Sequence, residues 1–139
     1  MTPQTIIKHL GLEAHPEGGY FKRTYCADLK LDSGRAAASS IYYFIEGGFT
    51  SLNHRTDGDE IWYYHAGAPL RLDIQSDQGP SQSHFLGTDF AAGQQPQICV
   101  KANDWQQATS MGSWTLVSCM VCPEFQFSSF ELSEQQQAE

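Results

Sequence analysis

The stretch that decides the fold runs from Gly48 to Gly67 and reads GFTSLNHRTDGDEIWYYHAG. His54 closes one predicted strand, DGD makes a tight turn, and Glu60 opens the next strand. Strands joined by so short a turn are expected to pair antiparallel, which would set His54 opposite Glu60 across the ladder. Because side chains alternate along a strand, Glu60, Trp62 and Tyr64 share one face. The stretch therefore predicts a partly desolvated acid–base pair between aromatic walls.

Working outward, the rest of the chain consists of short runs rich in β-branched and aromatic residues, separated by Gly, Asp, Asn and Pro. These runs are 19–25, 39–46, 60–66, 70–75, 96–101 and 114–121. Eight to ten such strands without intervening helices are typical of an all-β antiparallel sandwich or barrel. Residues 2–10 predict a short N-terminal helix, since Thr2 can cap it, Pro3 suits its first turn and Gly11 can end it.

Length and composition indicate one globular domain. The chain has 139 residues, of which 40% are hydrophobic and 17% charged, a balance that excludes a disordered protein. We expect a single domain over residues 1–132, followed by a polar tail at 133–139.

The net charge and the targeting signals of the sequence limit which partners and which cellular compartment we expect. With a formal net charge of −8, the protein would be repelled by phosphate backbones and anionic lipid surfaces, and its few cations form no cluster in the sequence. Neither nucleic acid nor membrane is therefore an expected partner. The sequence shows no secretory signal and no apolar run long enough to cross a bilayer. Four cysteines fit reduced thiols, and we expect a cytoplasmic protein.

Gly48, His54, Glu60 and Gly67 are spaced as in the first signature of the cupin superfamily, and residues 101–106 are similar to the second, with Asn103 at its glycine position. Further motifs resemble the DUF985, or Cupin_5, subfamily across residues 5–132. These are HPEGGYF, SIYYFI, DEIWYYHAG, LGTDF, GQQPQ, DWQQA and SWTLVSCMVCPEFQFSSFEL. The resemblance implies a double-stranded β-helix, the cupin or jelly-roll barrel, with a ligand pocket inside it. It also implies a homodimer.

Metal-binding cupins hold their ion with three histidines and one glutamate, and this chain departs from that pattern. His54 and Glu60 are present, but Thr56 and Gln106 stand at the other two positions. A hydroxyl and an amide are weak ligands for transition metals. We therefore expect no cofactor, or a weakly held divalent metal at His54, Glu60 and Gln106.

Two classes of function remain open, both with a small polar metabolite, sugar- or nucleotide-like, inside the barrel. The first resembles the sugar-nucleotide epimerase branch of the superfamily, a metal-independent isomerase, epimerase or dehydratase with His54 as the base. Glu60 would orient His54, and Tyr20 or Tyr64 would return the proton. The second is a non-catalytic binding or sensing module. A weakly metal-dependent cupin enzyme is a further alternative.

Other residues are predicted to contact the ligand or to have structural roles. Trp62, Tyr64, Gln106, Thr56 and Glu17 are the predicted ligand contacts. Arg23 and Arg55 are the cations best placed for an anionic ligand, although alternation directs Arg55 away from His54. The C-x-x-C spacing of Cys119 and Cys122 predicts packing rather than chelation, because residues three apart on a strand point to opposite faces.

Overall fold

The structure is a computed structural model that describes residues 1–16, 18–77 and 79–132. It confirms the all-β fold with a short N-terminal helix. The helix α1 spans Pro3–Leu10, with the Thr2 hydroxyl accepting from the Thr5 N–H and Gly11 ending it at a φ of 67°. The polar tail predicted at 133–139 lies outside the described residues.

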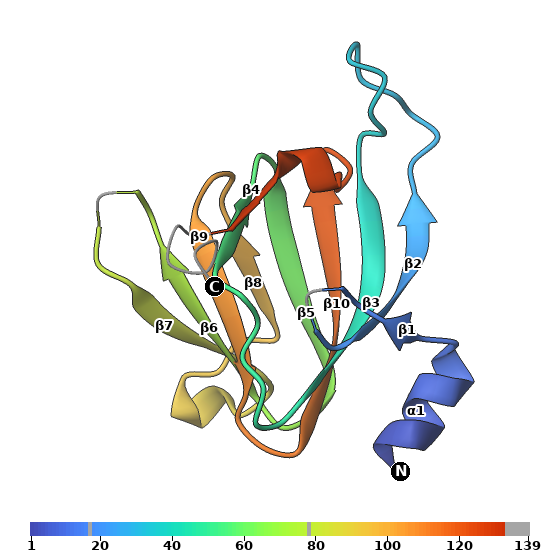
Figure 1. The fold of residues 1–139 in the computed structure, drawn as a ribbon. Helices are drawn as coiled ribbons and strands as arrows, with labels where there is room; N and C mark the ends of the chain where they lie inside the picture. Colours follow the sequence, from blue (N-terminus) through green and yellow to red (C-terminus); the bar gives the residue numbers. More distant parts are fainter. Residues whose placement is uncertain (17, 78, 133–139) are drawn as a thin grey trace.

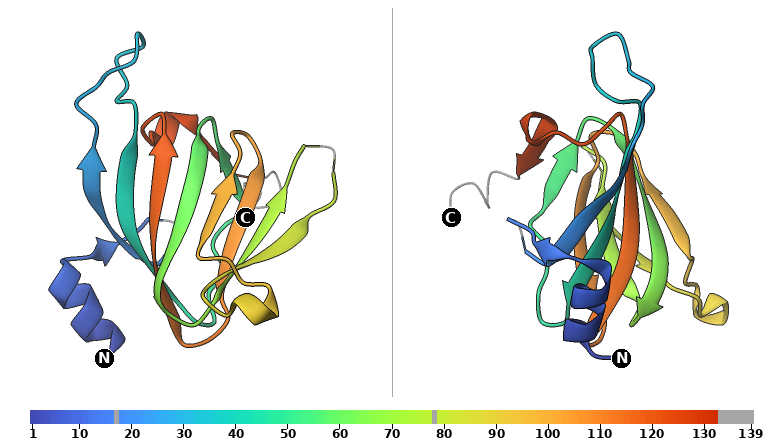
Figure 2. Two further views of the ribbon diagram at one scale, coloured as in Figure 1. Left: turned by 180° about the vertical axis from the view of Figure 1, so that it is seen from behind. Right: turned by 90° about the vertical axis from the view of Figure 1, so that its right-hand side faces the viewer.

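The strands form two antiparallel sheets packed face to face (Figures 1 and 2). The six-stranded sheet has the order β1-β2-β3-β10-β5-β8, and the five-stranded sheet has the order β11-β4-β9-β6-β7. The strands are β1 Glu13–Ala14, β2 Tyr20–Cys26, β3 Ser39–Glu46, β4 His54–Thr56, β5 Asp59–Gly67, β6 Leu70–Gln75, β7 Gln82–Leu86, β8 Gln97–Val100, β9 Trp105–Ser110, β10 Trp114–Cys122 and β11 Phe130–Leu132. Two short 3-10 helices occupy Phe90–Ala92 and Phe127–Ser129.

The six apolar runs of the sequence all became strands, and the polar ones were missed. β9, with the sequence WQQATS, and β7, with the sequence QSHFL, carry too few β-branched residues to predict a strand. Asn103, which precedes β9, adopts the predicted left-handed conformation with a φ of 70°.

The two faces of the six-stranded sheet bury different clusters. Its inner face packs on the second sheet through residues such as Val117 and Trp62. On its outer face, Ile6 of α1 covers Phe44. Alternation along β3 explains the division, because Ser39, Ile41 and Tyr43 point inward while Phe44 points outward.

Two segments lie beyond the sheets. Residues 27–38 form a long arm that projects past the ends of β2 and β3 (Figure 1). The C-terminal segment crosses the same end of the sandwich (Figure 1) and pairs with β4 through β11. No helix in the described part of the chain is both long and apolar enough to cross a membrane.

Candidate functional site

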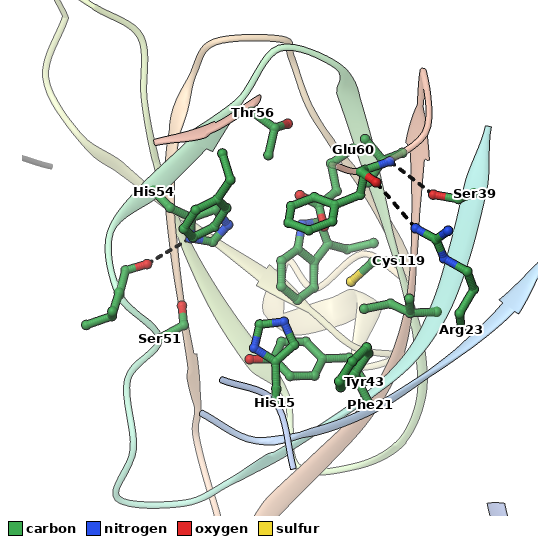
Figure 3. Close-up of a pocket in the computed structure, with 16 residues that line it drawn as sticks. His15, Phe21, Arg23, Ser39, Tyr43, Ser51, His54, Thr56, Glu60 and Cys119 are labelled. Atoms are coloured by element: carbon green, nitrogen blue, oxygen red, sulfur yellow. Dashed lines mark hydrogen bonds between the residues drawn. The ribbon is translucent and has the colours of Figure 1, made fainter. Parts of the chain in front are cut away.

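The two sheets enclose a cavity of about 220 Å³, shown in Figure 3. The six-stranded sheet supplies most of its wall, β4 supplies the opposite wall, and the C-terminal segment covers one side. The lining residues are His15, Phe21, Arg23, Ser39, Ile41, Tyr43, Ser51, Leu52, His54, Thr56, Glu60, Trp62, Cys119, Val121, Phe125 and Phe130. The wall is thus mostly apolar, with His54 and Glu60 set into it from different strands.

His54 enters the cavity from β4 as a neutral imidazole. Its Nδ1 lies 2.8 Å from the Leu52 carbonyl oxygen, and because a carbonyl only accepts, Nδ1 carries the hydrogen. The ring stacks on Phe130 with 5.0 Å between centroids. Burial lowers the pKa of His54, the bond to Leu52 opposes this shift, and the charge of His15 adds to it. The neutral ring therefore presents the lone pair of Nε2.

Glu60 enters from β5 on the opposite wall and is also buried. Its Oε1 accepts a hydrogen bond of 2.8 Å from the Gln106 amide. Burial raises the pKa of Glu60 to about 7, although hydrogen bonds with Gln106 and Cys119 act in the opposite direction. Near neutral pH this carboxyl group therefore populates both its protonated and its ionised form.

Gln106 orients Glu60 from behind rather than facing the cavity. It is fully buried on β9, in register with His54 on β4. The Trp62 indole N–H donates to its Oε1 at 3.0 Å. Since an indole nitrogen only donates, the amide oxygen must face Trp62 and the NH₂ group must face Glu60. The amide is thus fixed as a donor to the carboxylate.

Cys119 lies beside Glu60 on the inner face of β10. Burial raises the pKa of its thiol well above the ordinary value, and the negative charge of Glu60 raises it further. Cys119 therefore stays a thiol. Cys119 and Cys122 are both free cysteines, with Cys119 buried and Cys122 half-buried on β10, as strand alternation predicts.

The predicted hairpin between His54 and Glu60 is wrong. β4 pairs with β9 and β11, whereas β5 pairs with β10 and β8, so the DGD turn crosses from one sheet to the other. At this crossing a Cβ on Gly58 would lie 2.7 Å from the Cys122 carbonyl oxygen, so only glycine fits. His54 and Glu60 nevertheless face the same cavity, from opposite sheets.

The two predicted proton-returning tyrosines lie outside the cavity lining. Tyr20 points to the outer face of β2, because the inward positions belong to Phe21 and Arg23, and packs against Phe44 at 6.5 Å between centroids. The Tyr64 hydroxyl donates to the Gly67 carbonyl oxygen at 2.6 Å. Neither hydroxyl is placed to exchange a proton with a ligand in the cavity.

The other predicted contacts divide between the cavity and its surroundings. Trp62 and Thr56 line the cavity, and Arg23 stands at its edge (Figure 3). Arg55 lies elsewhere, paired with Asp77 and Glu131 at 3.0 Å each. Glu17 lies outside the described residues.

Several lining residues were not predicted from the sequence. Alternation along 39–46 could have found Ile41 and Tyr43, since the run has a clear inward face. Nothing in the sequence marks Phe125 and Phe130. They reach the cavity because Arg35 donates to the Glu124 carbonyl oxygen and the Ser39 hydroxyl accepts from the Phe125 N–H, contacts between segments far apart in the chain.

The donor set does not fit a transition metal. Gln106 has its oxygen on Trp62 and its NH₂ on Glu60, and the Thr56 hydroxyl donates to the Gly58 carbonyl oxygen at 3.1 Å. That leaves two strong ligands, His54 and Glu60, where tight sites use three or four. Within the described ranges no group of three or more His, Cys, Asp and Glu side chains is arranged to hold an ion.

Fold and site together define a cupin, a barrel with an interior pocket whose first signature carries His54 and Glu60. Residues 4–133 match the Cupin_5 family, described as Cupin superfamily (DUF985). The chain belongs to this family. No curated protein matches the sequence.

Solved structures agree with this assignment. Protein SO0799 from Shewanella oneidensis superposes with a TM-score of 0.92 at 37% identity, covering 99% of this chain and 88% of that one. A hypothetical protein from Leishmania major gives 0.90 at 29% identity, with 99% and 90% covered. A variant of Bacillus subtilis oxalate decarboxylase gives 0.67 at 13% identity, with 91% and 31% covered, a likeness of fold alone.

Proposed function

We propose that this cupin binds a small metabolite in its cavity and catalyses metal-independent proton transfer beside a carbonyl group, as in isomerisation, epimerisation or dehydration. One observation carries the proposal: His54 and Glu60 face the same largely apolar cavity from opposite sheets. A ligand lying between them would meet a proton acceptor, His54, on one side and a carboxyl group that can donate a proton, Glu60, on the other.

His54 acts as the base in this proposal. Its bond to Leu52 holds the hydrogen on Nδ1 and leaves Nε2 unprotonated, the form in which an imidazole accepts a proton. The lowered pKa keeps the ring neutral at physiological pH. Positioned general bases of this kind contribute roughly 10²–10⁴-fold to a rate.

Glu60 takes the acid role first expected of a tyrosine. A carboxyl group with a pKa of about 7 can deliver a proton and take it back near neutral pH. Because Oε1 accepts from Gln106, the transferable proton belongs on Oε2. Removing a proton on one face of the substrate and returning it on the other would invert a carbon centre.

The proposal is tested by solvent exchange. Enolisable carbonyl metabolites are incubated with the protein in D₂O, and deuterium incorporation is followed by mass spectrometry. We expect incorporation with the wild type and loss of at least about 100-fold in His54→Gln and Glu60→Gln. Tyr20→Phe and Tyr64→Phe are the matched controls, since their hydroxyls lie outside the cavity lining, and should exchange at the wild-type rate.

The outcomes separate the two classes of function. A compound that exchanges equally well in His54→Gln would refute the proton-transfer role. A compound that raises the melting temperature in proportion to its excess but never gains deuterium would indicate a binding or sensing module. For that second role the support is the aromatic wall, with Trp62, Tyr43 and Phe130 facing the ligand space.

A homodimer is also proposed. It is supported by the outermost strand β8, which ends its sheet in the described part of the chain and leaves a hydrogen-bonding edge for a second copy. Light scattering after gel filtration tests it, and a monomer mass across the concentration range would refute it.

A further inference from the structure

Most hydroxyl groups in the cavity wall already bond to the backbone. They are Ser39, Ser51, Thr56 and Tyr43, whose hydroxyl groups bond to backbone groups of Phe125, Ala108, Gly58 and Gly18. These bonds, of 2.8 to 3.1 Å, hold the side chains against the wall. Each hydroxyl group therefore keeps only part of its hydrogen-bonding capacity for a ligand, and the rest of the wall is largely apolar.

Apart from these hydroxyl groups, the polar or titratable residues that line the cavity are His15, His54, Glu60, Arg23 and Cys119, and Arg23 is the permanent cation among them. The Arg23 guanidinium group donates to Glu124 Oε2 at 3.4 Å and to the Phe125 carbonyl oxygen at 3.3 Å. Both distances exceed the 2.7–2.9 Å typical of charge-assisted bonds, and its side chain is 42% exposed. A guanidinium group has five N–H donors, so this cation has capacity for an anion at the cavity edge.

The size and walls of the cavity limit the ligand further. A cavity of about 150 Å³ holds a benzene ring, so about 220 Å³ holds one ring with a few added atoms. A nucleotide would not fit inside. The rings of Phe21, Tyr43, Trp62, Phe125 and Phe130 all line the space and favour a flat apolar body.

We propose that the ligand is a small, largely apolar carboxylic acid about the size of one ring, with its carboxylate on Arg23 and its reacting carbon between His54 and Glu60. The position of the reacting carbon rests on the proposed proton-transfer function; the carboxylate contact does not. Planar guanidinium and carboxylate groups match in a two-bond geometry. The inference replaces the sugar- or nucleotide-like ligand expected from the sequence.

Three probes of similar size test this inference on the full chain. Benzoate carries the ring and the charge, benzamide carries the ring alone, and xylitol carries hydroxyl groups without a ring. Each is titrated at neutral pH, and binding is followed by backbone amide NMR shifts around the cavity. We expect benzoate to bind roughly tenfold more tightly than benzamide, and xylitol to be the weakest.

Two arginine variants test whether Arg23 causes the preference for benzoate over benzamide. In Arg23→Gln the ratio of benzamide to benzoate dissociation constants should fall to within about twofold of one, because the charge-assisted bonds are lost. Arg71→Gln is the matched control: it removes the same charge, but Arg71 pairs with Asp73 on β6 and does not line the cavity. It should keep the wild-type ratio.

The inference is overturned if xylitol binds as tightly as benzoate, if neither aromatic probe binds, or if Arg23→Gln keeps the preference. Where benzamide still binds, loss of the carboxylate preference leaves the His54 and Glu60 proposal intact, since benzamide does not need Arg23. Conversely, failure of deuterium exchange leaves a measured preference for benzoate standing. The two proposals therefore fail separately.

Discussion

One half of the barrel interior is filled with side chains and the other half is hollow, although strands β3, β5 and β10 contribute to both. In the filled half Leu70, Leu72 and Leu86 are completely buried. In the hollow half, His54 and Glu60 face open space. Along β10, Val117 belongs to the core cluster and does not line the cavity, whereas Cys119 belongs to that cluster and also lines the cavity.

This difference in packing shows that the filled half stabilises the fold, whereas the hollow half lowers its stability and forms the candidate site. Filling space with aliphatic groups gains both burial and contact energy. Burying a carboxyl group and leaving a cavity beside it gains neither, and the pKa of about 7 for Glu60 records the cost of desolvation. Such an arrangement is typical of functional sites.

The largest expected effect comes from breaking the filled half. Leu72→Ala should lower the free energy of unfolding by about 2–5 kcal/mol, because it opens a cavity in close-packed core. Ile41→Ala, on the wall of the existing cavity, should cost less than about 2 kcal/mol, since that side chain already faces open space. Urea denaturation measures both. Equal losses would contradict the division into two halves.

The next effect is the pH dependence that Glu60 introduces. Its pKa is raised from 4.5 in the unfolded chain to about 7 in the fold, so the folded state holds its proton more tightly. The contribution of Glu60 to the free energy of unfolding is therefore greatest below pH 4.5 and is lost as the pH rises to about 7. Above that pH it no longer changes, and the total loss is about 3 kcal/mol.

Glu60→Gln isolates this contribution, because the other titrating groups are common to both proteins. His54 acts in the opposite sense: its lowered pKa gives stability that is present above about 6.5 and lost at lower pH. Wild-type stability relative to Glu60→Gln should therefore fall between pH 4.5 and 7. A difference that is flat across this range would show that the carboxyl group is not buried as described.

A smaller effect is expected from the hydrogen-bond chain behind the hollow half. Gln106→Leu removes the donor to Glu60 and the acceptor for Trp62, and should cost about 1–3 kcal/mol in stability. It should also raise the pKa of Glu60 further, measurable by NMR titration of its side-chain carboxyl carbon. Gln107→Leu, the next residue on β9, is the control and should leave that pKa unchanged.

The smallest effect should follow from Tyr20→Phe on the outer face. Tyr20 packs beside Phe44 under α1, and no shift in probe binding or deuterium exchange is expected. Its effect on stability should stay within about 0.5 kcal/mol. A large loss of exchange in this variant would return the acid role to Tyr20, and thus contradict the assignment to Glu60.

Sequence reasoning succeeded where the physics is local. Apolar runs such as 39–46 and 114–121 predicted β3 and β10 because strand propensity and alternation act between near neighbours. The helix ends at Thr2 and Gly11, and the left-handed turn at Asn103, depend on single residues and were predicted as well.

The site was only partly accessible from sequence. His54 and Glu60 were identified by their spacing, but their relation was mistaken, because a short turn gives no sign of whether it joins two strands of one sheet or crosses to another. Tyr20 was predicted as a residue that could return the proton, but the sequence does not reveal which face of β2 meets the core. Gln106 was expected in the pocket and instead bonds to Glu60 from behind.

By itself, the sequence determined the fold class, the family and two of the titratable residues that line the cavity, His54 and Glu60, since these follow from local patterning and motif spacing. Only the tertiary structure decided that His54 and Glu60 face each other across two sheets, that Phe125 and Phe130 close the wall, and that Glu60 titrates near pH 7. These properties depend on burial and on contacts between distant segments, which no local pattern of residues encodes.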